Sequence, residues 1–132
     1  MHYNRSELRR KIMTILYQIS MYQKNNVAYV VEDVIKENIE IDNEFVKEMV
    51  NGVLENVDAL DEMANKHLKN WDISRLGKTD QAILRMGIYE LLYTDTPDII
   101  CINEAVELAK LFSDDAVKDV INGVLDSIYH EK

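Results

Sequence analysis

The twelve residues Val46-Lys-Glu-Met-Val-Asn-Gly-Val-Leu-Glu-Asn-Val57 recur near the end of the chain as Val117-Lys-Asp-Val-Ile-Asn-Gly-Val-Leu-Asp-Ser-Ile128. Six of the twelve positions are identical, and the other six are conservative exchanges. At the same offset of 71 residues, segment 30–35 matches segment 101–106. A repeat of this length predicts two copies of one helical unit within the chain.

The spacing of apolar residues predicts an all-α protein. In the first helix, Leu8, Ile12, Ile15, Leu16 and Ile19 share one stripe at helical spacing. Similar patterns predict six further helices, near 28–38, 42–56, 58–69, 79–93, 99–111 and 114–129, with Asn4, Asp42 and Ser113 as caps. We therefore expect a single domain over 1–132 with about seven helices: an N-terminal half over about 1–57, a linking helix over about 58–70 and a C-terminal half over about 71–132.

Both copies of the repeat carry Asn-Gly inside a helical pattern, at Gly52 and Gly123. Glycine inside a helix costs about 1 kcal/mol relative to alanine. Because the apolar period continues through both sites, neither is read as a turn. We expect each glycine to let another helix approach closely, which is a structural role.

Composition indicates a soluble, cytoplasmic globular protein. No stretch approaches the length of a membrane-spanning helix, and no signal peptide opens the chain. The single cysteine, Cys101, excludes an internal disulfide and a thiolate metal cluster.

Signatures of catalysis are absent from the sequence. There is no glycine-rich phosphate loop and no nucleophile elbow. His2, His67 and His130 are scattered without partners at ligand spacing. We therefore expect no enzyme activity, no metal and no cofactor. Arg85 is expected to form a structural ion pair with acids nearby in sequence: Glu90, Glu104 or Glu107.

Charge is distributed unevenly along the chain. The net charge is −9, yet residues 1–24 hold five basic residues against Glu7 alone, which leaves −13 for the remainder. Such asymmetry suggests a localised site for a polyanion. The alternative is a helix end that is basic and merely solvated.

The first helix carries a second indication of nucleic-acid binding. Arg10 and Tyr17 lie about two turns apart on the side opposite the apolar stripe, while Arg5 and Arg9 flank that stripe. Basic groups for phosphates together with an exposed aromatic ring for stacking suit single-stranded RNA. Three or four phosphate contacts predict a log–log salt slope of roughly −2 to −3. Alternatively, Tyr17 packs under a neighbouring helix and the arginines are only solvated.

Several long motifs, in order, resemble the NusB family of transcription antitermination factors. They are Trp71-Asp-Ile-Ser-Arg-Leu76, Asp80-Gln-Ala-Ile-Leu-Arg-Met-Gly-Ile-Tyr-Glu-Leu-Leu92, Ile102-Asn-Glu-Ala-Val-Glu-Leu-Ala-Lys110 with Phe112, and Ile121-Asn-Gly-Val-Leu-Asp126. The stretch from Arg9 to Tyr17 matches the family's opening helix, so the resemblance covers nearly the whole chain. It implies the NusB fold of two perpendicular three-helix subdomains.

The resemblance also implies partners. The family binds boxA-type single-stranded RNA in rRNA leader transcripts together with NusE, a ribosomal small-subunit protein, within the RNA polymerase antitermination complex with other Nus factors. Carried over by position, the phosphate contacts are Arg5, Arg9, Arg10 and Lys11, and Tyr17 lies close to the bases. Further RNA-side positions around the start of the fifth helix are Ser74, Asp80 and Gln81.

The sequence departs from the family pattern at three places. Ser6 and Glu7 stand where basic residues are common, Gln81 replaces the usual Arg or Lys, and Val120 replaces an aromatic residue. Each change implies a weaker RNA contact, so affinity is expected to depend more on the protein partner or on a relaxed RNA sequence.

Two alternative functions remain at the level of sequence. One is a module of an rRNA cytosine methyltransferase, whose N-terminal domain resembles the same family; a catalytic domain would then have to follow Lys132. The other is a homodimeric scaffold that has lost RNA binding, which is compatible with the thinned basic cluster.

Overall fold

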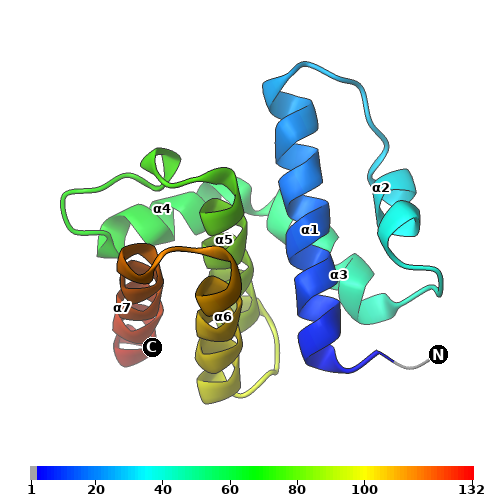
Figure 1. Cartoon of the computed structure of the whole chain (residues 1–132). Helices are drawn as coiled ribbons and strands as arrows, with labels where there is room; N and C mark the ends of the chain where they lie inside the picture. Colours follow the sequence, from blue (N-terminus) through cyan, green and yellow to red (C-terminus); the bar gives the residue numbers. More distant parts are fainter. Residues whose placement is uncertain (1–2) are drawn as a thin grey trace.

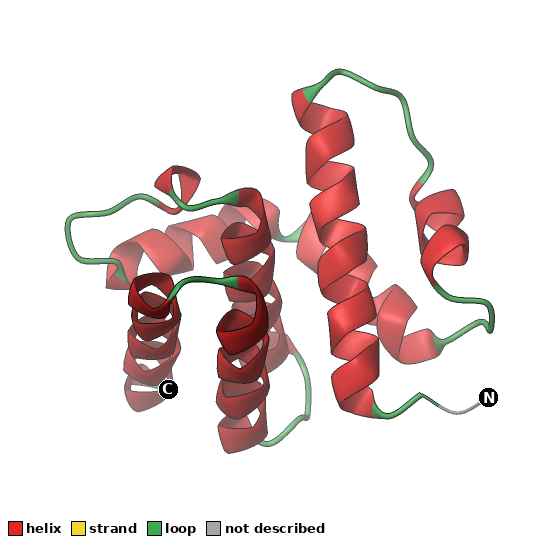
Figure 2. Cartoon of the chain, viewed as in Figure 1, coloured by secondary structure: helices red, strands yellow, loops and turns green. Residues whose placement is uncertain are grey.

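The computed structural model describes residues 3–132, and this part of the chain consists of helices joined by loops, without a strand (Figure 2). Seven α-helices and one short 3₁₀ helix make up the described range. In chain order they are α1 (Arg5–Lys24), α2 (Val31–Asn38), α3 (Glu44–Glu55), α4 (Val57–His67), η1 (Ile73–Arg75), α5 (Lys78–Tyr93), α6 (Asp98–Phe112) and α7 (Asp115–Glu131). The predicted all-α class and the number of helices are confirmed.

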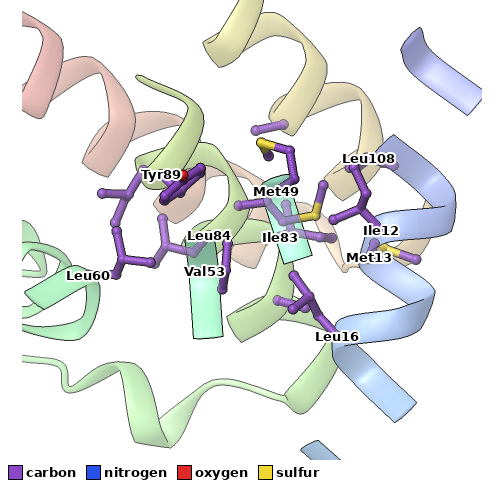
Figure 3. Close-up of a cluster of buried hydrophobic side chains, with 14 of the residues drawn as sticks. Ile12, Met13, Leu16, Met49, Val53, Leu60, Ile83, Leu84, Tyr89 and Leu108 are labelled. Atoms are coloured by element: carbon purple, nitrogen blue, oxygen red, sulfur yellow. The ribbon is translucent and has the colours of Figure 1, made fainter. Parts of the chain in front are cut away.

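The helices form two groups of three, α1–α3 and α5–α7, and α4 runs between them (Figure 1). Helix α5 lies at the centre and packs against α1, α3, α4, α6 and α7. Its buried side chains include Ile83 and Leu84, which meet Met49 and Val53 of α3 in the core (Figure 3). Burial of this kind is the main term that stabilises a helical domain.

The N-terminal caps of α3 and α7 each lie one residue later than the sequence predicts. Asn4 caps α1 as expected. The predictions for Asp42 and Ser113 are wrong, because Asn43 and Asp114 hold extended backbone angles and accept a hydrogen bond from the N–H three residues ahead. These two true caps are themselves 71 residues apart, so the repeat extends to the helix ends.

The two repeat glycines differ in their surroundings. A Cβ at Gly52 would overlap the ring of Tyr89 on α5, so a close helix approach is confirmed there. The same expectation is wrong for Gly123, whose Cβ would meet nothing within 4 Å. The close approach in the C-terminal half is at Gly87, where a Cβ would lie 3.0 Å from Leu125 Cδ1.

No helix in the described part of the chain is long and apolar enough to cross a membrane.

The contrast between the glycines predicts substitutions of opposite sign. Gly52→Ala should lower the free energy of unfolding by about 1–3 kcal/mol, because Tyr89 has to move out of a packed core. Gly123→Ala should raise it by about 1 kcal/mol, since alanine favours the helix and the added methyl group meets open space. Urea unfolding monitored by circular dichroism measures both. Shifts of the same sign would contradict the packing described above.

Candidate nucleic-acid interface

Helix α1 presents Arg10 and Tyr17 on one exposed face, as the sequence predicts. Arg10 is exposed and the Tyr17 side chain keeps 38% of its surface accessible, so Tyr17 is not covered by a neighbouring helix. Lys11 beside them is half-buried. Within residues 3–132, neither Arg10 nor Lys11 has an acidic partner at ion-pair distance. This face therefore carries a flat aromatic ring and uncompensated positive charge.

Arg5 stands at the start of the same helix and is held in place from the side. Its guanidinium carbon lies 3.9 Å from the centre of the Phe45 ring on α3. A guanidinium stacked on an aromatic face is favourable and still leaves its N–H groups free to donate. Arg5 is exposed, so it remains accessible to a phosphate.

Arg9 lies in the interior, and its assignment to phosphate contact has to be corrected. The residue is only 3% exposed. Its Nε and Nη2 donate to the two carboxylate oxygens of Glu90 at 2.9 and 2.5 Å, and Nη1 lies 3.5 Å from Glu104. Burial lowers the pKa of Arg9, but the hydrogen bonds and charge of Glu90 outweigh it and raise that pKa above its usual value. The donors that a phosphate would need are already occupied.

Two other residues, Ser6 and Arg85, also make polar contacts with acidic side chains. Ser6, at a position that is often basic in the family, donates a 2.7 Å hydrogen bond to Glu104 and so supports the same acidic cluster. Arg85 does form an ion pair, but the expected partners are wrong: it donates to both carboxylate oxygens of Asp61 on α4, at 2.7 and 2.9 Å. Glu90 and Glu104 are committed to Arg9.

The three RNA-side residues expected around the start of α5 differ in their exposure. Ser74 is exposed on η1, where its N–H donates to Asp72 at 2.9 Å. Asp80 is half-buried and accepts a hydrogen bond from the hydroxyl of Ser113, which ties α5 to the turn between α6 and α7. Gln81 is 3% exposed and donates to the carbonyl of Leu76 at 2.8 Å. Its assignment to the RNA side is therefore corrected to a structural role.

A shallow hollow lies between the C-terminal part of α1 and the start of α5. It has a volume of about 280 Å³ and is bordered by Ser20 and Gln23 of α1 and by Lys78 of α5. Ser20 is three residues beyond Tyr17, and Lys78 is four residues beyond Ser74. The hollow therefore places the Lys78 cation of α5 beside the C-terminal part of α1.

Sequence reasoning missed Lys78, although a signal was present. Residues 66–78 hold four basic residues against Asp72 alone, a net charge of +3 on a chain of net charge −9. This second basic segment is as localised as the first, but it spans a loop and two helix ends, so no periodic face draws attention to it.

The described residues include no group of three or more His, Cys, Asp and Glu side chains arranged to hold a metal ion. His2 lies outside the described residues. Cys101 is buried, and burial together with the nearby Glu90 raises the pKa of its thiol to about 12, which disfavours the reactive thiolate.

The buried pair leads to a stability prediction. Arg9→Ala should lower the free energy of unfolding by about 3–5 kcal/mol, because it leaves the Glu90 carboxylate buried without its counter-charge. Replacing both partners, Arg9→Met with Glu90→Leu, should recover most of that loss. Lys66→Ala is the control: it removes an exposed ion pair with Glu131 and should leave the free energy of unfolding nearly unchanged. Equal losses for Arg9→Ala and Lys66→Ala in urea unfolding would argue against a buried pair.

Comparison with known proteins agrees with this architecture. The NusB family model matches residues 6–130. The transcription antitermination protein NusB of Campylobacter jejuni (strain RM1221) is 41% identical over 131 residues, which are 97% of each chain. That of Staphylococcus haemolyticus (strain JCSC1435) is 43% identical over 126 residues, which are 95% of this chain and 98% of the relative.

Among solved structures, NusB of T. maritima is similar with a TM-score of 0.84 at 28% identity, covering 99% of this chain and 94% of that one. A structure of antitermination factors NusB and NusE in complex with double-stranded RNA contains a similar chain with a TM-score of 0.81 at 26% identity, covering 97% of both.

Proposed function

The chain belongs to the NusB family, and we propose that it is a non-catalytic RNA-binding adaptor in transcription antitermination. In this proposal it acts with NusE to hold boxA-type single-stranded RNA during rRNA transcription, as part of the RNA polymerase antitermination complex with other Nus factors. The observation that carries the proposal is the exposed Arg10–Tyr17 face of α1, where positive charge without acidic partners lies beside an accessible aromatic ring.

The chemistry of that face fits a single strand. Phosphate groups would be held by Arg5, Arg10 and Lys11, whereas an unpaired base could stack on Tyr17. Bases in a duplex are already stacked on one another, so an isolated ring on a helix adds little to duplex binding. With Arg9 buried, about three phosphate contacts remain, and the expected log–log salt slope is about −2.

Comparison with relatives supports the partner and the function class. A similar solved chain is described with NusE and RNA, and the C. jejuni relative that matches nearly its whole length is named an antitermination protein. These similarities favour an adaptor over a methyltransferase module. The acidic remainder of the chain also suits a basic ribosomal protein, because opposite charge accelerates encounter.

A homodimeric scaffold remains the second candidate, because α6 exposes large apolar side chains. Ile99 is 69% exposed and Leu111 is 60% exposed. Exposed apolar surface of this kind marks protein interfaces, and either NusE or a second copy could cover it. Sedimentation equilibrium of the chain alone separates these cases: a monomer at micromolar concentration excludes the scaffold, whereas a stable dimer supports it.

The RNA proposal predicts the effect of two substitutions. Tyr17→Ala should weaken binding of a boxA-like single-stranded RNA by about 1–3 kcal/mol through lost stacking. Arg10→Ala should weaken it less and should also reduce the salt slope by about 0.7, one phosphate contact. Gel-shift titrations at several salt concentrations measure both effects.

Matched controls come from the same chain. The control for Tyr17 is Tyr93, an exposed tyrosine (44%) at the C-terminal end of α5. The control for Arg10 is Lys36, an exposed cation on α2. Tyr93→Ala and Lys36→Ala should leave RNA affinity within about twofold of the wild type. Equal effects of test and control variants would refute the Arg10–Tyr17 face as the RNA site.

The thinned basic cluster predicts dependence on the partner. The chain alone should bind boxA-like RNA weakly, and addition of NusE should tighten binding by at least about tenfold, because two weak contacts act on one ligand. The same gel shift with and without NusE measures this. Absence of RNA binding under both conditions at low salt would rule out the adaptor and leave the scaffold.

A further inference from the structure

A second hollow opens on the C-terminal half, between the end of α4 and the exposed side of α7. Its volume is about 340 Å³, and Trp71, Val120 and Gly123 form much of its apolar wall. Lys69, His67 and Ser127 provide the polar edge. The size is at the lower end of the roughly 300–1,000 Å³ typical of small-ligand sites, so it suits one planar group.

The internal repeat shows what kind of group this helix surface accepts. Gly52 of α3 and Gly123 of α7 are equivalent positions in the matching segments. At Gly52 the ring of Tyr89 lies directly on the helix backbone, whereas at Gly123 no atom lies within 4 Å of the position of a Cβ. The glycine that receives an aromatic ring in the first half therefore faces open space in the second.

Trp71 is held at the rim of this hollow by a well-connected loop. Asn65 accepts a hydrogen bond from the N–H of Ile73 at 2.7 Å and donates to Asp72 at 3.1 Å. The guanidinium of Arg75 lies 5.7 Å from the centre of the Trp71 ring. Half of the Trp71 side chain surface nevertheless remains accessible, at 50%. Preorganised aromatic surface of this kind costs little conformational entropy on binding.

Two cations beside the hollow are available to a polyanion. Residues 66–78 carry a net charge of +3, but Lys66 and His67 of this segment contact Glu131 of α7. Within residues 3–132, neither Lys69 nor Arg75 has an acidic group at ion-pair distance. At the polar edge, His67 Nδ1 and the Ser127 hydroxyl are 2.7 Å apart and hydrogen-bond to each other, and His67 Nε2 lies 2.9 Å from Glu131. A stacking surface and two cations without acidic partners thus lie together.

We propose that this hollow is a nucleotide subsite, in which one unpaired RNA base stacks on Trp71 above Gly123 while Lys69 and Arg75 contact the adjoining phosphates. The proposal rests on the RNA-binding function proposed above and extends its site to the C-terminal half. An aromatic side chain of a protein partner would fit the apolar wall, but it would leave the uncompensated cations without a partner.

Trp71 is the only tryptophan of the chain, so its fluorescence reports on this hollow alone. The experiment titrates the full chain at low salt with a single-stranded boxA-like oligoribonucleotide of about twelve nucleotides. We expect Trp71 fluorescence to be quenched in parallel with the gel shift, because a stacked base quenches indole emission. Trp71→Ala should weaken binding of this RNA by about 5- to 100-fold.

A variant that fills the hollow tests the subsite more specifically than Trp71→Ala does. Gly123→Leu places a side chain where the base would lie, in open space, so it should weaken RNA binding by at least fivefold without lowering the urea midpoint. Asn122→Leu adds a side chain of similar size at the neighbouring exposed position, outside the hollow, and should leave RNA affinity unchanged. Opposite effects on stability and affinity separate a binding role from a structural one.

The outcomes distinguish the subsite from the function on which it rests. RNA binding that depends on Tyr17 but neither quenches Trp71 nor responds to Gly123→Leu overturns the subsite and leaves the adaptor. No RNA binding by the wild type, with or without NusE, overturns both. Quenching by NusE in the absence of RNA, with Gly123→Leu weakening NusE and not RNA binding, assigns the hollow to the protein partner and also overturns the subsite.

Discussion

The buried ion pair between Arg9 and Glu90 sets the placement of the first helix. Glu90 is 2% exposed in the central helix α5, and an unpaired carboxylate at that depth would be strongly destabilising. Arg9 supplies both hydrogen bonds from α1, and Glu104 of α6 lies close to the same guanidinium. Because neighbouring residues on a helix point about 100° apart, fixing Arg9 inward turns Arg10 outward. The exposed face that carries Arg10 and Tyr17 is thus a consequence of a buried contact.

The Arg9–Glu90 contact affects the whole fold because Glu90 lies on the central helix α5. It packs against five other α-helices and joins two halves that share a sequence repeat. The halves are equal in pattern but not in environment, since Tyr89 of α5 covers Gly52 while Gly123 on α7 stays open. One half of the repeat therefore completes the core, whereas the equivalent surface of the other half stays open.

Positive charge is concentrated in two segments of the chain. The chain as a whole is acidic, but residues 1–24 and 66–78 carry net charges of +4 and +3. The fold brings the second segment next to α1 through the hollow bordered by Ser20, Gln23 and Lys78. Two separate basic segments on an acidic body favour a polyanion near them and a basic protein elsewhere. The proposed adaptor function needs this separation, because a surface of one uniform charge would repel either the RNA or the basic ribosomal protein.

Local features of this protein were determined by the sequence alone. Apolar spacing predicted the seven helices, caps were placed within one residue, and the exposed Arg10–Tyr17 face followed from the period of one helix. Long motifs were sufficient to indicate the family. Tertiary structure decided the features that depend on distant partners: the burial of Arg9 against Glu90, the pairing of Arg85 with Asp61, and the open space at Gly123. The reason is physical, since helical periodicity shows which way a side chain points, but only the packing of other helices decides whether that side is buried, paired or free.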